Sequence, residues 1–361
     1  MNSVRLTGTV RVVGAGLLGT SIGLALRKQG LDVVIDDLSP ANQRLAIDYG
    51  AGRAPAEGDN ISLVVVCVPP DVTAKTVAFE LKNHTDAVVT DVASVKAQIL
   101  QELIAANVDL SRYVGSHPMA GRERGGALSG RADLFFTRPW VISANSNSSA
   151  SATGLVEKLA LDLGATPIVA DPQSHDRAVA LVSHLPQLVS TLLAARLENA
   201  DSQEVALAGQ GLRDTTRIAA SDATLWLQIL SANSERVVPL LEQLDSDLDA
   251  LIAALKDLSQ PGAMSVIGDL LKRGNSGVES IPGKHGSQPK QYSRVVVMID
   301  DRPGQLAKLL TEVGEVGVNL EDLKLEHSPG AQVGLPELYV LPEAESKLVS
   351  ALTERGWRIV G

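Results

Sequence analysis

The sequence predicts an α/β domain, an all-α domain and a small α+β domain, in that order along its 361 residues. Apolar strand-like runs alternate with helical patterns up to residue 170, and only helical patterns follow in residues 171–272. Short strand and helix patterns return after residue 291. These alternations are typical of three successive domains. We therefore expect domains at 1–170, 171–272 and 292–361, with a linker at 273–291.

Composition limits the class of protein. Hydrophobic residues make up 45% of the chain and charged residues 20%, so the chain can bury large cores. A net charge of −10 argues against nucleic acid as a partner. The single cysteine, Cys67, cannot form an intrachain disulfide and indicates a reducing compartment. The N-terminus shows no signal-peptide pattern, and no run approaches a membrane span, so we expect a cytoplasmic protein without membrane contact.

The first domain begins with a strand, a glycine turn, a helix and a second strand. Residues 10–13 (VRVV) precede GAGLLG, the helical pattern ends at Gly30, and DVVIDD follows. Further strand-like runs share a short apolar pattern; they lie at 61–68, 87–92, 112–116, 139–144 and 166–170. Strands separated by helices predict a mostly parallel sheet covered on both faces.

The glycine turn matches the pattern G-x-G-x-x-G in the context that makes it informative, between a strand and a helix. Gly14 allows a tight turn, Gly16 lets a pyrophosphate approach the backbone, and Gly19 lets the helix pack closely on the sheet. Leu17 and Leu18 fill the variable positions and open the helix, whose N-terminus favours phosphate. The pattern predicts a Rossmann-type dinucleotide site; the alternative is a glycine turn without a ligand.

The second strand ends on two carboxylates, Asp36 and Asp37, at 20 and 21 residues past Gly16. A carboxylate there binds the ribose hydroxyls and repels a 2′-phosphate, so we expect NAD rather than NADP. Val68 and Pro69 end the next strand, where the nicotinamide half of the cofactor usually runs. The alternative is that Val68 and Pro69 only terminate the strand and bind no cofactor.

Ser94 and His117 follow two later strands of the predicted sheet. Parallel strands place their carboxyl ends at one edge, where ligands of open α/β sheets bind. A hydroxyl could meet an imidazole there and fix its tautomer. Taken alone, Ser94 is a helix N-cap, and His117 in GSHPMAG is a surface histidine in a turn.

The helical domain carries apolar residues around most of several helices, which predicts a dimer interface, or else a bundle core within one chain. We expect Pro186 to kink the first long helix. Arg213 and Arg217, four residues apart, are expected on one helical face, where a guanidinium binds a substrate carboxylate. The alternative is two solvated arginines.

The last module follows the order β-α-β-β-α-β. Strand-like runs at SRVVVMID, VNLEDLKLEH, ELYVLP and WRIVG are separated by helical patterns at GQLAKLLTEVGEVG and ESKLVSALTERG. This order predicts a ferredoxin-like fold.

Several motifs together resemble the prephenate dehydrogenase family, the prephenate and arogenate dehydrogenases of tyrosine biosynthesis. They are GAGLLG, DVASVK, GSHPMAGRERGG, the SHD…VSHLP stretch at 174–186, and GLRDTTRIAASDATLW. The resemblance implies His117 as catalytic base, Ser94 as its orienting partner and Arg217 as ligand of the substrate carboxylate. It also places Glu123 near the substrate. The chain departs from some relatives at Gln187, where they carry a second histidine, and at Gln210, where they carry glycine.

The segment DDRPGQLAKLLTEVGEVGVNLEDL resembles an ACT domain, a small amino-acid-sensing fold. That resemblance implies an effector site, with tyrosine as the effector. The matching positions lie on two turns: Gly304, Gln305, Leu306, Asn319 and Leu320. The alternative is a module that only dimerises.

The two resemblances imply an NAD-dependent oxidative decarboxylation of prephenate to 4-hydroxyphenylpyruvate, regulated by an aromatic amino acid, in a homodimer without a metal. Arogenate dehydrogenase, which gives tyrosine directly, remains an alternative. So does a hydroxy-acid dehydrogenase, which needs a catalytic lysine or His–carboxylate pair in the helical region. A non-catalytic sensor of dinucleotide and amino acid would not need Ser94, His117 and Arg217 together.

Overall fold

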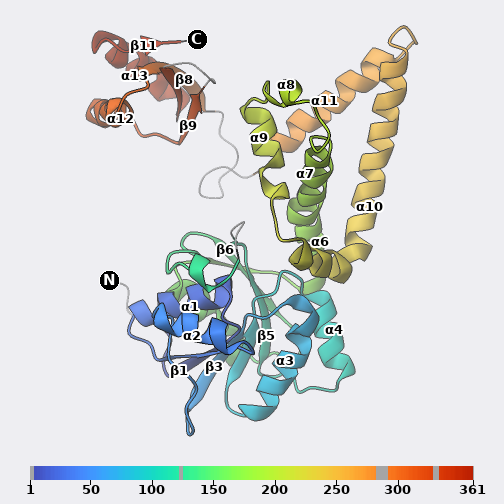
Figure 1. Ribbon diagram of the computed structural model, residues 1–361, viewed down its shortest axis with the longest axis vertical. Coiled ribbons are helices and arrows are strands. Elements are labelled where there is room, and N and C mark those ends of the chain that lie inside the picture. Colours follow the sequence, from blue (N-terminus) through green and yellow to red (C-terminus); the bar gives the residue numbers. More distant parts are fainter. Residues whose placement is uncertain (1–3, 122–124, 282–291, 328–332, 361) are drawn as a thin grey trace. The chain divides into compact units, whose positions relative to one another are not determined.

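The computed structural model describes residues 4–121, 125–281, 292–327 and 333–360. Contacts divide the chain into two compact units (Figure 1). The first unit comprises residues 1–200 and 215–244, and the second comprises 201–214 and 245–361.

A seven-stranded sheet in the order β2-β1-β3-β4-β5-β6-β7 forms the centre of the first unit. Its strands are β1 (Thr9–Val13), β2 (Val33–Asp36), β3 (Ile61–Val66), β4 (Val88–Asp91), β5 (Tyr113–Pro118), β6 (Pro139–Ala144) and β7 (Thr166–Val169). All neighbouring pairs are parallel except β5 and β6, which are antiparallel. The Rossmann-like nucleotide-binding architecture is therefore confirmed.

Helices cover both faces of this sheet (Figure 1). The helices are α1 (Leu17–Lys28), α2 (Pro40–Asp48), α3 (Pro70–Asn83), α4 (Ala97–Ala105) and α5 (Ala150–Asp162), with a 3₁₀ turn η1 (Ala127–Ser129). One core joins α1 and α5 to the face that carries Val12 and Ile35. The other core joins α3 and α4 to the face that carries Val34 and Val64. Most side chains of the central strands β3, β4 and β5 are thus buried, as the apolar runs predicted.

Two local expectations in this unit are wrong. β5 continues through His117 to Pro118, because β6 pairs with it and His117 lies opposite Val141. His117 is therefore a strand residue rather than a turn residue. Ser94 is not an N-cap, because α4 begins only at Ala97 and its N-cap residue is Lys96.

A continuous helical stretch follows the sheet: α6 (Pro172–Val179), the π-helical turn η2 (Ala180–His184) and α7 (Leu185–Ala195). Where we predicted a kink at Pro186, the structure has this π turn just before the proline. Proline lacks an N–H, and its ring crowds the carbonyl one turn earlier, so a wider turn before it relieves the conflict.

Residues Pro172–Ala195 are long and apolar enough to span a membrane by length and composition alone. Only 28% of the apolar window is buried within the chain. Leu181, Val182 and Leu192 are more than half exposed. The stretch also carries His175, Asp176 and His184, which are buried and hydrogen-bonded. A polar side bound to the first unit and an exposed apolar side are typical of a helix that packs against another protein chain.

The remaining helical elements are α8 (Ser202–Val205), α9 (Gln210–Thr216), the 3₁₀ turn η3 (Arg217–Ala219), α10 (Ala223–Lys256) and α11 (Ala263–Glu279). Arg213 lies in the α-helix α9, which ends at Thr216, and Arg217 opens η3, which follows directly. α10 is bent at Asn233, whose backbone is non-helical (φ −129°, ψ 18°).

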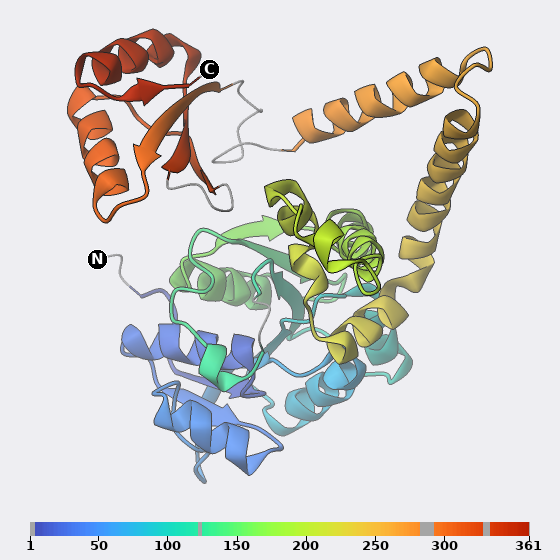
Figure 2. The same ribbon diagram turned by 45° about the horizontal axis from the view of Figure 1, so that its top comes forward.

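The last module contains β8 (Ser293–Asp300), α12 (Gln305–Val316), β9 (Asp322–His327), β10 (Val333–Val340), α13 (Pro342–Glu354) and β11 (Arg358–Ile359). Its strands form an antiparallel sheet in the order β11-β8-β10-β9. Both helices pack on one side of the sheet, over Val297 and Leu338 (Figure 2).

Candidate functional site

The glycine turn between β1 and α1 has the shape that a dinucleotide needs. Gly14 has φ +103°, and a Cβ on it would lie 2.5 Å from the carbonyl oxygen of Cys67. A Cβ on Gly19 would lie 1.9 Å from the carbonyl oxygen of Gly14. A Cβ on Gly16 would meet no atom within 4 Å. Two glycines are therefore required by the fold, and the third leaves open space beside the backbone.

The N-terminus of α1 is free of competing groups. Its N-cap is Gly16, which provides no side-chain cap, and no acidic residue lies in the first turn, which begins Leu17-Leu18. Backbone N–H groups and the helix dipole are therefore left to attract an anion. Together with the space beside Gly16, they fit a pyrophosphate group.

The two carboxylates after β2 have different partners. Asp37 accepts hydrogen bonds from the backbone N–H of Ala15 (2.6 Å) and of Ser39 (2.8 Å). Asp36 instead accepts one from Arg11 Nη2 (2.6 Å), and Arg11 also binds the buried Glu80. Burial opposes the charge of Arg11, yet these two carboxylates raise the pKa of its guanidinium. Asp37 is thus anchored on the glycine turn itself, whereas Asp36 is held by Arg11.

Val68 and Pro69 lie against the glycine turn. Val68 Cγ1 would be 3.3 Å from a Cβ on Gly14, and Pro69 is the N-cap residue of α3. The segment therefore forms part of the wall of the dinucleotide cradle. The residues present fit NAD.

His117 near the end of β5 lies at the head of a chain of hydrogen bonds. Its Nδ1 is 2.9 Å from Nε2 of His175, and His175 Nδ1 is 2.7 Å from Oδ1 of Asp176. His175 and Asp176 are both buried, whereas His117 is partly accessible. Within the described residues, Ser94 makes no hydrogen bond to His117. The neighbour that holds the imidazole is thus His175, from α6.

Asp176 binds the first domain through its carboxylate. Oδ1 accepts the N–H of Lys96 and Oδ2 the N–H of Ala97, each at 2.9 Å. It therefore caps α4 from outside the helix, which explains why α4 needs no serine cap. Burial opposes ionisation of Asp176, but hydrogen bonds from His175 and these two N–H groups outweigh it and lower its pKa.

The imidazole of His117 is held neutral. Burial is the largest cause that lowers its pKa well below 6.5, and the nearby basic groups His175, Lys96 and His184 further disfavour a positive charge on its ring. Lys96 is itself buried and pairs with Asp91, which also accepts a hydrogen bond from Tyr113 (2.7 Å). A neutral imidazole with an accessible edge is suited to accept a proton.

A second buried histidine connects this network to α10. Asn233 Nδ2 donates to the carbonyl oxygen of Asp176 (2.8 Å) and to Nδ1 of His184 (3.2 Å). Burial lowers the pKa of His184 to about 4. The bend in α10 at Asn233 is therefore fixed by contacts that begin at Asp176.

Of the predicted substrate ligands, Gln187 is buried in α7, and its Oε1 accepts a long hydrogen bond from Ser221 Oγ (3.4 Å). Arg217 is exposed in η3, which packs against α7. Arg213 is exposed in α9. Glu123 lies outside the described residues. Gln187 and Arg217 thus lie on elements that pack against each other.

The predicted effector residues lie on two turns of the last module. Gly304 has φ +90° and is the N-cap of α12, which begins Gln305-Leu306. Asn319 donates to Glu321 Oε1 (2.9 Å), and Leu320 packs against the module's core.

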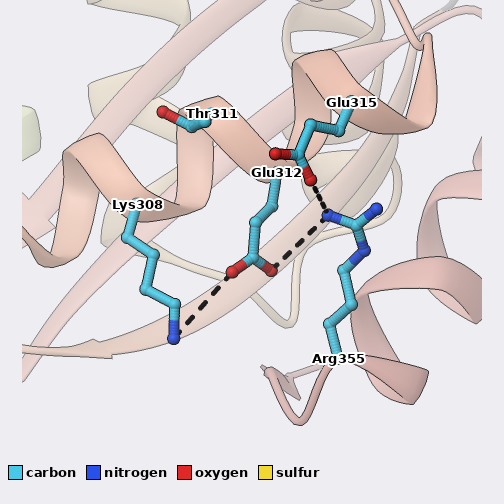
Figure 3. A pocket seen from close by; sticks show the side chains of 5 residues that line it. All are labelled: Lys308, Thr311, Glu312, Glu315 and Arg355. Atoms are coloured by element: carbon cyan, nitrogen blue, oxygen red, sulfur yellow. Dashed lines mark hydrogen bonds and ion pairs between the residues drawn. The ribbon is translucent and has the colours of Figure 1, made fainter.

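A hollow of about 490 Å³ lies elsewhere in the last module, between α12 and the end of α13 (Figure 3). Its charged side chains pair with one another: Arg355 with Glu315 (2.6 Å) and Glu312, and Glu312 with Lys308. It is lined by none of the predicted effector residues. Among the described residues, no group of three or more His, Cys, Asp or Glu side chains is placed to hold a metal ion.

Comparison with known proteins agrees with this geometry. A model described as the nucleotide-binding domain of prephenate dehydrogenase matches residues 22–169, and its dimerisation domain matches 171–267. Over 358 residues the chain is 36% identical to "Probable prephenate dehydrogenase NovF" of Streptomyces niveus, covering 97% of this chain and 98% of that protein. A cyclohexadienyl dehydrogenase of Zymomonas mobilis is 27% identical, covering 68% of this chain and 88% of its own.

Solved structures are similar in fold. Prephenate dehydrogenase from Aquifex aeolicus, in complex with hydroxyphenyl propionate and NAD⁺, is 27% identical with a TM-score of 0.65, covering 75% of this chain and 99% of its own. An arogenate dehydrogenase from Synechocystis, 24% identical with a TM-score of 0.60 and covering 74% and 99%, shares the fold. The chain therefore belongs to the prephenate dehydrogenase family and is an NAD-dependent oxidoreductase of that family.

Proposed function

We propose that the protein catalyses the NAD-dependent oxidative decarboxylation of prephenate to 4-hydroxyphenylpyruvate, a step of tyrosine biosynthesis. The observation that carries this proposal is the neutral His117, held by His175 at the sheet edge where the strands end. Prephenate has a ring hydroxyl whose proton such a base can take, and relatives named for this substrate cover nearly the whole chain.

The residues have separate tasks in the reaction. The chemistry that bound NAD supplies is acceptance of a hydride from the carbon that bears the ring hydroxyl. His117 takes the hydroxyl proton as that carbon becomes a carbonyl. The ring carboxylate leaves as carbon dioxide, its bonding electrons complete the aromatic ring, and the oxygen regains a proton to give the phenol. Aromatisation supplies the driving force, so the protein has to orient the reactants and move one proton.

Arg217 is proposed to bind a carboxylate of the substrate, since a guanidinium matches a carboxylate with two parallel hydrogen bonds. Ser94, Gln187, Arg213 and Glu123 are proposed to contact the substrate around it. The buried Gln187 offers a neutral amide where a relative's histidine would titrate.

Arogenate is the second candidate substrate, because it differs from prephenate only in the side chain remote from the reacting ring. A solved relative of the same fold is named for it. The deciding experiment follows absorbance at 340 nm with prephenate or arogenate and with NAD or NADP, in all four pairings. Turnover that is fastest with prephenate and NAD supports the proposal. Turnover with arogenate alone would make arogenate the substrate in place of prephenate. Folded protein that binds NAD but turns over neither compound would refute the proposed enzymatic activity.

We further propose that residues 292–360 form an ACT-like, ferredoxin-like module that binds tyrosine as a feedback effector. The strand order β11-β8-β10-β9 with both helices on one side supports the fold assignment. The proposed site comprises Gly304, Gln305, Leu306, Asn319 and Leu320. Tyrosine should inhibit the wild-type protein, and Asn319→Ala should lower its potency without changing uninhibited turnover. Equal inhibition of both proteins would move the effector site elsewhere.

The proposed assembly is a homodimer through the helical region, and the proposed location is the cytoplasm. The family model for residues 171–267 is described as a dimerisation domain, and the exposed apolar residues of η2 and α7 support an interface there. Nucleic acid is not a proposed partner, because the net charge is −10.

A further inference from the structure

The pair His175–Asp176 determines which nitrogen of His117 carries a proton. We propose that these two side chains are positioning residues that keep the proton of His117 on Nδ1 and leave Nε2 bare to accept the substrate's hydroxyl proton. The proposal rests on the proposed base role of His117. It assigns the orienting task to α6 rather than to Ser94.

The donors around Asp176 determine its protonation state. Its carboxylate accepts two backbone N–H groups, from Lys96 and Ala97, at 2.9 Å each. Two backbone N–H donors, one on each oxygen, favour the ionised carboxylate, which can only accept hydrogen bonds. The 2.7 Å contact from Asp176 Oδ1 to His175 Nδ1 therefore requires a proton on that nitrogen.

The next step concerns His175. A neutral imidazole carries one proton, so a proton on Nδ1 leaves Nε2 as an acceptor. This Nε2 lies 2.9 Å from Nδ1 of His117, and the two rings meet edge to face at 78°. His117 Nδ1 must then be the donor, and its Nε2 has no proton.

The reverse arrangement fails on the same distances. A proton on His175 Nε2 would place its bare Nδ1 against a carboxylate oxygen at 2.7 Å, which sets two acceptors against each other in a buried site. A doubly protonated His175 would place a positive charge next to the ring of His117, with 2.9 Å between the two nitrogens, and would oppose the positive charge that His117 has to take up as a base. The ionised carboxylate therefore propagates one tautomer through both rings.

The same series of hydrogen bonds also stabilises the protonated state of His117. When His117 gains a proton on Nε2, its Nδ1–H still donates to His175, and the polarised His175 donates to the charged Asp176. Hydrogen bonds to an ionised group are shorter and stronger than neutral ones, so the arrangement favours the imidazolium without rearranging. The backbone N–H groups at the start of α4 hold the carboxylate of Asp176 in place, so it does not move when His117 gains the proton.

One test reads the tautomer directly and needs no substrate. Full-length protein labelled with ¹⁵N-histidine is examined by NMR at pH 7.5, with His117→Asn to assign the signals. We expect His117 to show a protonated Nδ1 and an unprotonated Nε2, and Asp176→Asn to change that pattern. A protonated Nε2 in the wild type would overturn the proposal, even if the protein proves to be a prephenate dehydrogenase.

A second test separates the two contacts of His175 with a matched pair of variants. Glutamine places its amide near the position of Nε2 and can still accept from His117, whereas asparagine reaches only the position of Nδ1, beside Asp176. We expect kcat of His175→Gln within about tenfold of wild type and kcat of His175→Asn lower by about 10²–10³, with the KM for NAD unchanged in both.

Melting temperatures of the two His175 variants serve as the control for folding. The kinetic test uses His175 because Asp176→Asn also disturbs the cap of α4 and could fail to fold. Equal losses of kcat in the two folded His175 variants would reduce His175 to a packing role and refute the proposal. If the wild type turns over neither prephenate nor arogenate, the proposed function fails, while the NMR result still decides the tautomer.

Discussion

At the scale of single residues, replacing two side chains of the proposed site should impair catalysis in different ways. His117→Asn removes the base, so we expect kcat to fall on the order of 10²–10⁴-fold. Arg217→Ala removes a contact that substrate and transition state share, so it should mainly raise the KM for the substrate. Steady-state kinetics at saturating NAD checks both. Near-normal turnover of His117→Asn would show that another group takes the proton.

The pH profile of the wild type should reflect the buried state of His117. Its pKa lies well below 6.5 because burial, and then the positive charge around it, disfavours the protonated form. A base works only when unprotonated, so kcat/KM should stay high as pH falls through 6.5 and decline only at lower values. A profile from pH 5 to 9 measures this. A fall of kcat/KM centred at or above pH 6.5 would contradict a buried base.

His184 should make the folded state sensitive to acid. Its pKa is about 4 in the fold against a usual value of 6.5, so between these values the unfolded chain binds a proton that the folded chain does not. The stability contribution is complete above pH 6.5 and is lost as pH falls to about 4. The loss is on the order of 3 kcal/mol for this group.

His184→Asn keeps an acceptor for Asn233 and cannot titrate. Urea unfolding at pH 7.5 and 4.5 should therefore show a smaller acid loss for this variant than for the wild type. Equal losses in the two proteins would assign the acid sensitivity to other groups, such as His117.

At the scale of elements, the three glycines of the β1–α1 turn should separate folding from cofactor binding. A methyl group on Gly16 meets open space within the protein, so Gly16→Ala should keep the melting temperature but weaken NAD binding, because it fills the space for the pyrophosphate. Gly19→Ala is the matched contrast. Its Cβ would lie 1.9 Å from a backbone oxygen, so it should destabilise the fold itself.

Thermal melting and NAD titration by fluorescence, run on both variants, distinguish the two effects. Unchanged NAD affinity in a folded Gly16→Ala protein would place the pyrophosphate away from the helix N-terminus. A fully stable Gly19→Ala protein would show that the turn can move aside.

Much of this element-level organisation could be predicted from the sequence. Local patterns predicted the strands of the parallel sheet, the glycine turn and the end of β2, because periodicity and glycine chemistry act over a few residues. No local pattern assigned roles to His175 and Asp176, because their partners His117 and Lys96 lie 58 and 80 positions away in the sequence. The adjacent His-Asp pair in SHD was the available signal. The cap of α4 and the extension of β5 were missed for the same reason.

At the scale of the whole molecule, the helical region leaves apolar surface that one chain does not cover. Along the second half of α10, Leu244, Leu248, Ile252 and Leu255 are 39–56% exposed. Their spacing of four, four and three residues places them on one side of the helix. An apolar stripe of this kind is typical of an interface, and the proposed homodimer supplies the partner.

Breaking that stripe should therefore dissociate the dimer while leaving each chain folded. We expect the double variant Leu248→Glu and Ile252→Glu to sediment as a monomer at concentrations where the wild type is a dimer, because two carboxylates from each chain would be buried against apolar side chains. Ser246→Glu adds a carboxylate on the opposite side of α10 and should leave the dimer intact. Sedimentation velocity over a range of concentrations measures all three proteins. A double variant that stays dimeric, with unchanged far-ultraviolet circular dichroism, would place the interface on another surface, such as the exposed apolar side of α7.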